Sequence, residues 1–130
     1  MFGAPTPILR SFDEKRTKRF YLDFLGFELV FEHRFEEGTP LYMGVRKDAC
    51  VLHLSEHYGD GTPGSAIRIP VDDVRSYMAE LRAKKFENAR PGEPELQDWG
   101  SWEITIQDPS SNSLTFYTCL LYTSPSPRDS

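Results

Sequence analysis

The sequence predicts an α+β domain built from two β-α-β-β-β modules. At 130 residues the chain has room for one domain, placed at residues 1–118. The same order of strand and helix patterns occurs twice, without obvious sequence identity between the two copies. Each copy has too few strands to bury both faces of its sheet alone, so the two are expected to pair into one curved sheet.

The first module covers about residues 5–57 and opens with a strand at Thr6–Arg10. Either Ser11 or Asp13 is expected to cap the helix that follows, and Gly26 to end it. One face of this helix carries Phe20, Tyr21, Phe24 and Leu25. Those apolar side chains are expected to pack on the sheet.

Three further strands complete the first module. They are expected at Glu28–Arg34, Leu41–Arg46 and Ala49–Ser55. In the first of them Leu29, Phe31 and His33 alternate with the other residues, so these three should share one face. Turns at Glu36–Pro40 and Lys47–Asp48 separate the strands.

The second module covers about residues 65–118 and follows a Gly/Pro-rich linker at Tyr58–Gly64. A strand at Ala66–Ile69 precedes a helix that Asp72 or Asp73 caps. Helical spacing relates Val74, Tyr77, Met78 and Leu81, which form its apolar face. The long polar loop after this helix is expected to hold a short strand near Asn88–Arg90, and the module closes with strands at Trp102–Gln107 and Ser113–Thr118.

Composition excludes several classes of partner. A formal charge of −5 argues against nucleic acid, whose phosphates require a basic face, and it suits a cationic ligand. No apolar run is long enough to cross a membrane, and the N-terminus lacks the basic and apolar regions of a signal peptide. Cys50 and Cys119 make no disulfide framework, which fits a reducing compartment. A cytoplasmic protein is therefore expected.

The last segment, residues 119–130, reads CLLYTSPSPRDS. It resembles the translation of an adaptor used to build sequencing libraries rather than protein-coding sequence. We therefore expect a non-native tail that takes no part in the fold or the function.

Several segments together carry a family resemblance. Residues 98–118, DWGSWEITIQDPSSNSLTFYT, combine a Trp-Gly corner, a strand that ends in Asp-Pro-x-x-Asn, and a second strand. Three earlier segments contribute to the resemblance: FYLDFLGFELVFEHRF, PLYMGV and VLHLSEHYGDGTPG. In their order and spacing along the chain, these segments and residues 98–118 together resemble the bleomycin-resistance branch of the glyoxalase/dioxygenase (vicinal oxygen chelate) superfamily. This resemblance implies a U-shaped mixed sheet around a cleft, and an intertwined homodimer that sequesters one bleomycin-like antibiotic in each of its two clefts.

The resemblance also indicates where a metal would bind. Enzymes of this superfamily hold a divalent metal with His, Gln or Glu on the first and last strands of a module. The matching positions here lie near Thr6, at Ser65 or Ala66, and at Thr115, which are not competent ligands. We therefore expect no metal, no cofactor and no enzymatic activity.

Two alternatives remain open. The first is a metal-dependent lyase or dioxygenase of the same superfamily that uses His33, His53 and Glu56, with His57 nearby, in place of the usual ligands. The second is a binder or sensor of another small cationic or aromatic metabolite, since a fold does not identify a ligand.

A bulky cationic antibiotic with a planar tail calls for aromatic walls and acidic rims. The candidate ligand-binding residues are Trp99, Trp102, Phe35, Tyr42, His33, His53, Asp98 and Glu103. Trp99 occupies the Trp-Gly corner and is the first stacking candidate. Trp102 alternates with Ile104 and Ile106, a pattern that favours core packing. The acidic candidates, with Glu36 and Glu37, are alternatively ordinary solvated carboxylates.

Overall fold

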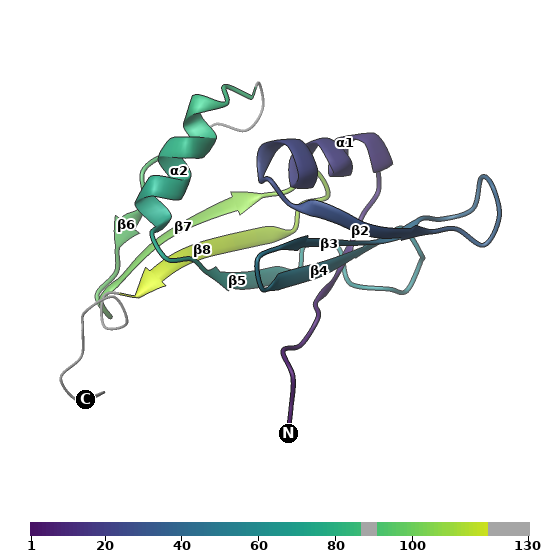
Figure 1. Cartoon of the computed structure of the whole chain (residues 1–130), viewed down its shortest axis with the longest axis horizontal. Coiled ribbons are helices and arrows are strands. Elements are labelled where there is room, and N and C mark those ends of the chain that lie inside the picture. Colours follow the sequence, from purple (N-terminus) through teal and green to yellow (C-terminus); the bar gives the residue numbers. More distant parts are fainter. Residues whose placement is uncertain (87–90, 120–130) are drawn as a thin grey trace. The chain divides into compact units, whose positions relative to one another are not determined.

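Two four-stranded sheets, each with a helix beside it, make up the computed structural model (Figure 1). It describes residues 1–86 and 91–119. The chain divides into a first unit, Met1–Ala66 with Gln107–Ser113, and a second unit, Ile67–Ile106 with the chain from Leu114 onward. Within the described residues no helix is long and apolar enough to span a membrane.

The first unit has the predicted β-α-β-β-β order. Its elements are β1 (Ile8–Arg10), α1 (Glu14–Lys18) with a π-helical continuation η1 (Arg19–Phe24), β2 (Glu28–His33), β3 (Tyr42–Lys47) and β4 (Cys50–Ser55). The strands lie in the order β1-β4-β3-β2. β1 runs parallel to β4, whereas β3 is antiparallel to both of its neighbours.

Asp13, one of the two predicted caps, begins helix α1. Its carboxylate accepts a hydrogen bond of 3.0 Å from the backbone N–H of Arg16, which has no partner within the helix. The other candidate, Ser11, instead shares a hydrogen bond of 2.8 Å with the Thr17 hydroxyl. Gly26 ends the helical segment with a φ of +89°, a conformation that glycine adopts without steric cost.

The core of the first unit lies between this helix and one face of its sheet. The helical segment buries Phe20, Tyr21, Phe24 and Leu25, and the sheet buries Leu9, Met43, Val45, Leu52 and Leu54. Burying a large apolar side chain contributes about 1.5–3 kcal/mol, so this layer makes a large contribution to the unit's stability. We call the opposite face of this sheet, turned away from α1, the open face.

One predicted feature of β2 is wrong. Strict alternation would place Leu29 and Phe31 on the same face, but the pairing of β2 with β3 shifts between them. Leu29 lies opposite Val45, a core residue, whereas Phe31 lies opposite Gly44, the next residue along β3. A β-bulge adds one residue to a strand and thereby moves the following side chains to the other face. Phe31 consequently lies on the open face.

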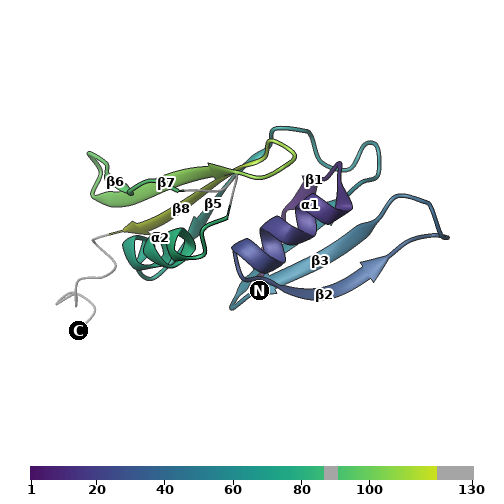
Figure 2. The same ribbon diagram turned by 90° about the horizontal axis from the view of Figure 1, so that it is seen from above.

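The second unit repeats the order. Its elements are β5 (Ala66–Pro70), α2 (Val74–Ala83), β6 (Glu95–Leu96), β7 (Ser101–Gln107) and β8 (Ser113–Cys119), and the strands lie in the order β5-β8-β7-β6 (Figure 2). The short strand of the polar loop is β6. The expected strand at Asn88–Arg90 lies outside the described residues, and so does the tail from residue 120.

Helix α2 follows its sequence pattern closely. Asp73 caps it, because its carboxylate accepts hydrogen bonds from the backbone N–H groups of Arg75 at 3.1 Å and Ser76 at 3.2 Å. The predicted apolar face packs on the second sheet, with Val74, Met78 and Leu81 fully buried. Tyr77 is half-buried, and its ring meets the Phe116 ring edge-on at 5.5 Å.

The Asp-Pro-x-x-Asn turn between β7 and β8 belongs to the first unit. One oxygen of the buried Asp108 carboxylate accepts from the backbone N–H groups of Ser110 and Asn112, both at 2.8 Å. The other accepts from the Tyr21 hydroxyl at 2.6 Å and from the Asn112 side chain at 2.9 Å. The same amide donates to the Arg10 carbonyl at 2.8 Å. The turn is therefore fastened to both β1 and the first helical segment.

Candidate functional site

Three rings from three adjacent strands form a cluster on the open face. Phe31 of β2 and Tyr42 of β3 are nearly parallel, with centroids 6.2 Å apart and planes at 13°. His53 of β4 meets both rings edge-on, at 5.2 Å from Phe31 and 5.3 Å from Tyr42. Phe31 is 39% exposed and the other two are half-buried. We call Phe31, Tyr42 and His53 the aromatic cluster.

A hydrogen bond holds two members of this cluster together. The Tyr42 hydroxyl and His53 Nδ1 lie 2.8 Å apart. Burial, with a smaller contribution from the charge of Asp60, raises the pKa of Tyr42, so its hydroxyl keeps its proton at neutral pH. When that hydroxyl donates to Nδ1, the other imidazole nitrogen carries the hydrogen and is a hydrogen-bond donor.

The remaining predicted residues of the first unit lie apart from this cluster or at its edge. His33 pairs with Tyr42 across the strands and is exposed. Phe35 lies in the loop after β2 and is 87% exposed. Sequence reasoning missed Phe31 as a ligand-binding candidate, although its alternation with His33 was visible. Its contacts with Tyr42 of β3 and His53 of β4 depend on strand pairing, which the sequence alone does not show.

The alternative metal site finds little support in the geometry. Glu56 is held by the backbone N–H of Leu41, which donates to its carboxylate at 3.0 Å. Across residues 1–86 and 91–119, no group of three or more His, Cys, Asp or Glu side chains is placed to hold a metal ion. His33, His53 and Glu56 are therefore not gathered into a ligand set.

The resemblance placed the metal-ligand positions near Thr6, near Ser65 or Ala66, and at Thr115, and none of these side chains is a common metal ligand. On the first and last strands of the first unit, Ile8 lies directly beside His53. In the second unit, Thr115 of β8 shares a hydrogen bond of 2.8 Å with Thr105 of β7. Arg68 of β5 lies over the Tyr117 ring of β8, 4.5 Å from its centroid. Of these side chains, the imidazole is the one that metals commonly use.

A second group of side chains surrounds Trp99 in the second unit. The Arg68 guanidinium donates to both oxygens of Glu103, at 3.2 and 2.7 Å, and the Trp99 indole N–H donates to one of them at 3.0 Å. These contacts, chiefly the one from Arg68, lower the pKa of Glu103 to about 2. We call Trp99, Glu103, Arg68 and Tyr117 the Trp99 corner.

This arrangement changes the role expected for Glu103. Its carboxylate was predicted to form an acidic rim for a cationic ligand, but Arg68 already compensates its charge. Trp99 remains 63% exposed, and Asp98 beside it is exposed as well. Arg68 and Tyr117 were missed because nothing in the sequence indicates that they meet across β5 and β8.

Trp102 lies on the other face of the second sheet. The guanidinium of Arg75, on α2, stands 4.7 Å from its ring centroid. Its neighbour Glu103 points to the face that carries the Trp99 corner, as alternation along a strand requires. The geometry thus favours packing against the helix for Trp102, the option that its alternation with Ile104 and Ile106 had suggested.

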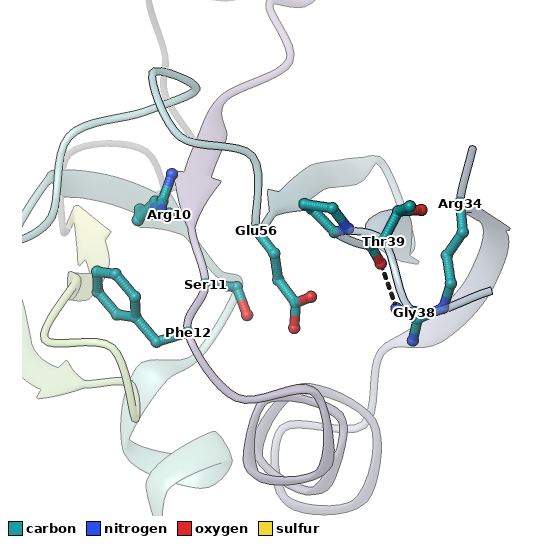
Figure 3. Close-up of a pocket in the computed structure, with 8 residues that line it drawn as sticks. Arg10, Ser11, Phe12, Arg34, Gly38, Thr39 and Glu56 are labelled. Carbon is teal, nitrogen blue, oxygen red and sulfur yellow. Dashed lines mark hydrogen bonds between the residues drawn. The ribbon is translucent and has the colours of Figure 1, made fainter. Parts of the chain in front are cut away.

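Of two open pockets, one lies outside these groups and the other shares Glu103 with the Trp99 corner. The first, of about 350 Å³, is lined by Arg10, Ser11, Phe12, Arg34, Gly38, Thr39, Pro40 and Glu56 (Figure 3). At its edge Arg34 donates to the Thr39 carbonyl at 2.8 Å and pairs with Glu14. The second pocket, of about 360 Å³, is lined by Glu93, Glu95, Gln97, Glu103, Ile104 and Thr105. Sequence reasoning identified neither pocket.

Comparisons with known proteins agree with this fold. The antibiotic-binding protein TnmS3 from Streptomyces sp. CB03234 superposes with a TM-score of 0.72 at 17% identity, over 92% of this chain and 97% of that one. The bleomycin resistance determinant encoded on transposon Tn5 gives 0.71 at 25% identity, over 92% and 99%. No curated protein matches the chain.

A third structure adds an experimentally observed ligand. The bleomycin-binding protein of Streptomyces verticillus, solved with copper(II)-bleomycin, gives a TM-score of 0.67 at 27% identity, over 92% of this chain and 97% of that one. A family model described as "Glyoxalase superfamily protein" matches residues 1–120. The chain therefore belongs to the glyoxalase superfamily, on the branch that contains the bleomycin-resistance proteins.

Proposed function

We propose that this protein binds a bleomycin-family antibiotic and sequesters it without modifying it. The observation that carries the proposal is the aromatic cluster, in which Phe31 stays 39% exposed on a sheet face turned away from the core. A protein gains little by exposing ordered rings to water, whereas such rings are common anchors for planar ligands. Relatives at 25–27% identity are a bleomycin resistance determinant and a protein solved with bleomycin.

The Trp99 corner offers a second stacking surface in the second unit. The indole N–H bonded to Glu103 holds the Trp99 ring in place, which reduces the entropy lost when a ligand stacks on it. Because Arg68 compensates Glu103, we assign the attraction for a cationic ligand to the ring faces and to the overall negative charge rather than to this carboxylate.

We further propose that the protein works as a cytoplasmic homodimer. The edge strand β2 is exposed along its whole length, with Leu29 at 38% and Val30 at 54%. An exposed apolar edge strand is a template for pairing with another chain, and natural proteins rarely leave one uncovered. A second copy of this chain would cover it.

The proposal includes no chemical step. His53 carries the imidazole of the aromatic cluster, and its Nδ1 is engaged by the Tyr42 hydroxyl. A sequestering protein needs affinity and a slow off-rate but no acid, base or nucleophile. Binding alone would then lower the concentration of free drug.

The test is a titration of the purified, EDTA-treated protein with metal-free bleomycin, followed by tryptophan fluorescence and by calorimetry. Saturation at one drug per subunit with a submicromolar Kd would support sequestration, and recovery of unchanged drug by mass spectrometry would support the absence of chemistry. If bleomycin neither changes the signal nor releases heat, the assignment of this ligand is wrong. A screen of other planar cationic metabolites would then follow.

A further inference from the structure

Gly44 occupies an unusual place beneath the aromatic cluster. It lies on β3 directly between Phe31 of β2 and His53 of β4. A Cβ added at Gly44 would lie 2.4, 2.9 and 3.1 Å from three atoms of the Phe31 ring. An edge of that ring therefore fills the space where any other residue would have a side chain.

The backbone itself does not require glycine at this position. Gly44 is absent from the glycines with positive φ, so its conformation is one that other residues adopt in a strand. It is fully buried under its neighbours. Since a strand glycine costs stability, a reason other than backbone geometry must be sought, and close approach by a ring is such a reason.

The vacant position shapes the surface above it. With its edge over Gly44, the Phe31 ring comes within 5.2 Å of the His53 ring and stays within 13° of the Tyr42 plane. A planar ligand that lies parallel to one of these two rings therefore lies parallel to the other. The His53 imidazole stands at the edge of this surface, nearly perpendicular to it, and offers a hydrogen-bonding nitrogen.

We infer that the absence of a side chain at Gly44 creates a subsite for one planar heteroaromatic ring, which stacks on Phe31 and Tyr42 and is hydrogen-bonded at its edge by His53. This inference rests on the proposed function and names the chemical class that its first unit accepts. Gly44 acts as a positioning residue: it contacts Phe31, and Phe31 contacts the ligand. A larger residue would displace the Phe31 ring and disrupt its parallel arrangement with the Tyr42 ring.

The experiment uses benzothiazole as the probe, a planar bicycle with one ring nitrogen, and follows backbone amide shifts of the full-length protein by NMR. Benzothiazole should shift the Gly44 and His53 amides saturably. Benzothiophene, which has the same shape without the nitrogen, should bind more weakly, and the non-planar cyclohexanol should not bind there. Loss of a stacking partner weakens such contacts by about five-fold.

The variants Phe31→Leu and Gly44→Ala should each weaken the binding of benzothiazole by about five-fold. Phe12→Leu is the matched control, because Phe12 is 57% exposed in the same unit but outside the aromatic cluster. Equal affinity in wild type, Phe31→Leu and Gly44→Ala would overturn the inference, as would absence of binding to wild type. If Gly44→Ala does not fold, Phe31→Leu alone decides.

A parallel bleomycin titration separates this inference from the proposed function. Bleomycin binding that is unchanged in both variants would leave sequestration standing and refute the subsite. Benzothiazole binding that follows the predicted order, in a protein that ignores bleomycin, would support the subsite and refute the drug assignment.

Discussion

The hydroxyl of Tyr21 donates a hydrogen bond of 2.6 Å to Asp108, and both side chains are buried. This bond joins the first helical segment to a turn 87 residues further along the chain. The same carboxylate organises the turn by accepting from two backbone N–H groups and from Asn112. Tyr21 therefore stabilises a charged group that would be costly to bury alone.

Replacing Tyr21 with Phe should lower the free energy of unfolding by about 1.5–3 kcal/mol, the usual range for a hydrogen bond to a charged group. Urea unfolding monitored by circular dichroism measures this loss. Tyr58→Phe is the matched control, because Tyr58 is 97% exposed and should change little. Equal losses in the two variants would contradict the role assigned to the buried bond.

The same tyrosine should make the fold sensitive to alkali. Burial and the neighbouring Asp108 raise the pKa of Tyr21 well above its ordinary value. The folded state then holds this proton more tightly than the unfolded state. The stabilisation is fully present below the unfolded pKa of about 10 and is lost as the pH rises above it. Urea midpoints should fall above about pH 10, and Tyr21→Phe should flatten that fall.

Glu103 should act at the opposite end of the pH scale. The pKa of Glu103 is lowered to about 2, mainly by its hydrogen bonds with Arg68. The resulting stabilisation is fully present when the pH is above the pKa of this carboxyl in the unfolded chain, and it is lost as the pH falls through about 2. Glu103→Gln should reduce this acid sensitivity. The Trp99 emission maximum should shift in the same pH range, because protonation removes the negative charge from the group that accepts the indole N–H. A shift that survives in Glu103→Gln would be inconsistent with this assignment.

The two tryptophans should separate binding from stability. Trp99→Ala should weaken bleomycin binding by about 1–3 kcal/mol while leaving the melting temperature nearly unchanged, since Trp99 is 63% exposed. Trp102→Ala should lower the melting temperature and leave the Kd of the folded protein nearly unchanged, because Trp102 contacts Arg75 on the helix side. If Trp102→Ala weakened bleomycin binding and Trp99→Ala lowered the melting temperature, the roles assigned to the two tryptophans would be wrong.

The exposed edge strand should control association. Light scattering should report a dimer for the wild type, and Val30→Lys should shift it toward monomer, because a charge on an edge strand opposes pairing. Glu37→Lys, at an exposed loop position, is a charge control that should leave the dimer intact. A wild type that stays monomeric at high concentration would refute the dimer proposal.

Much of the fold could be read from local patterns. The two caps, Asp13 and Asp73, and the helix end at Gly26 follow from local hydrogen bonding and backbone conformation. The order of strands and helices along each module followed from the alternating and helical spacings. These signals lie within a few residues of one another, so a single sequence contains them.

The site was harder to predict, because its contacts are long-range. Phe31 reached the open face through a bulge, which alternation alone does not reveal. Glu103 was expected to be a free carboxylate, but its partner Arg68 is 35 residues away. The reason for glycine at position 44 is a ring on another strand. Each of these facts depends on how the strands pair, and a shift of one residue in register moves the side chains to the other face of the sheet.

The turn at residues 107–113 also constrains how the protein folds during synthesis. Tyr21 emerges from the ribosome long before Asp108 does, since 87 residues separate them. At about 5–20 residues per second, this delay amounts to roughly 4–17 s. During that time the buried Tyr21 hydroxyl lacks its acceptor, and the turn that contacts β1 is missing from the first unit. We therefore expect the nascent chain to depend on chaperones until its C-terminal hairpin has been translated.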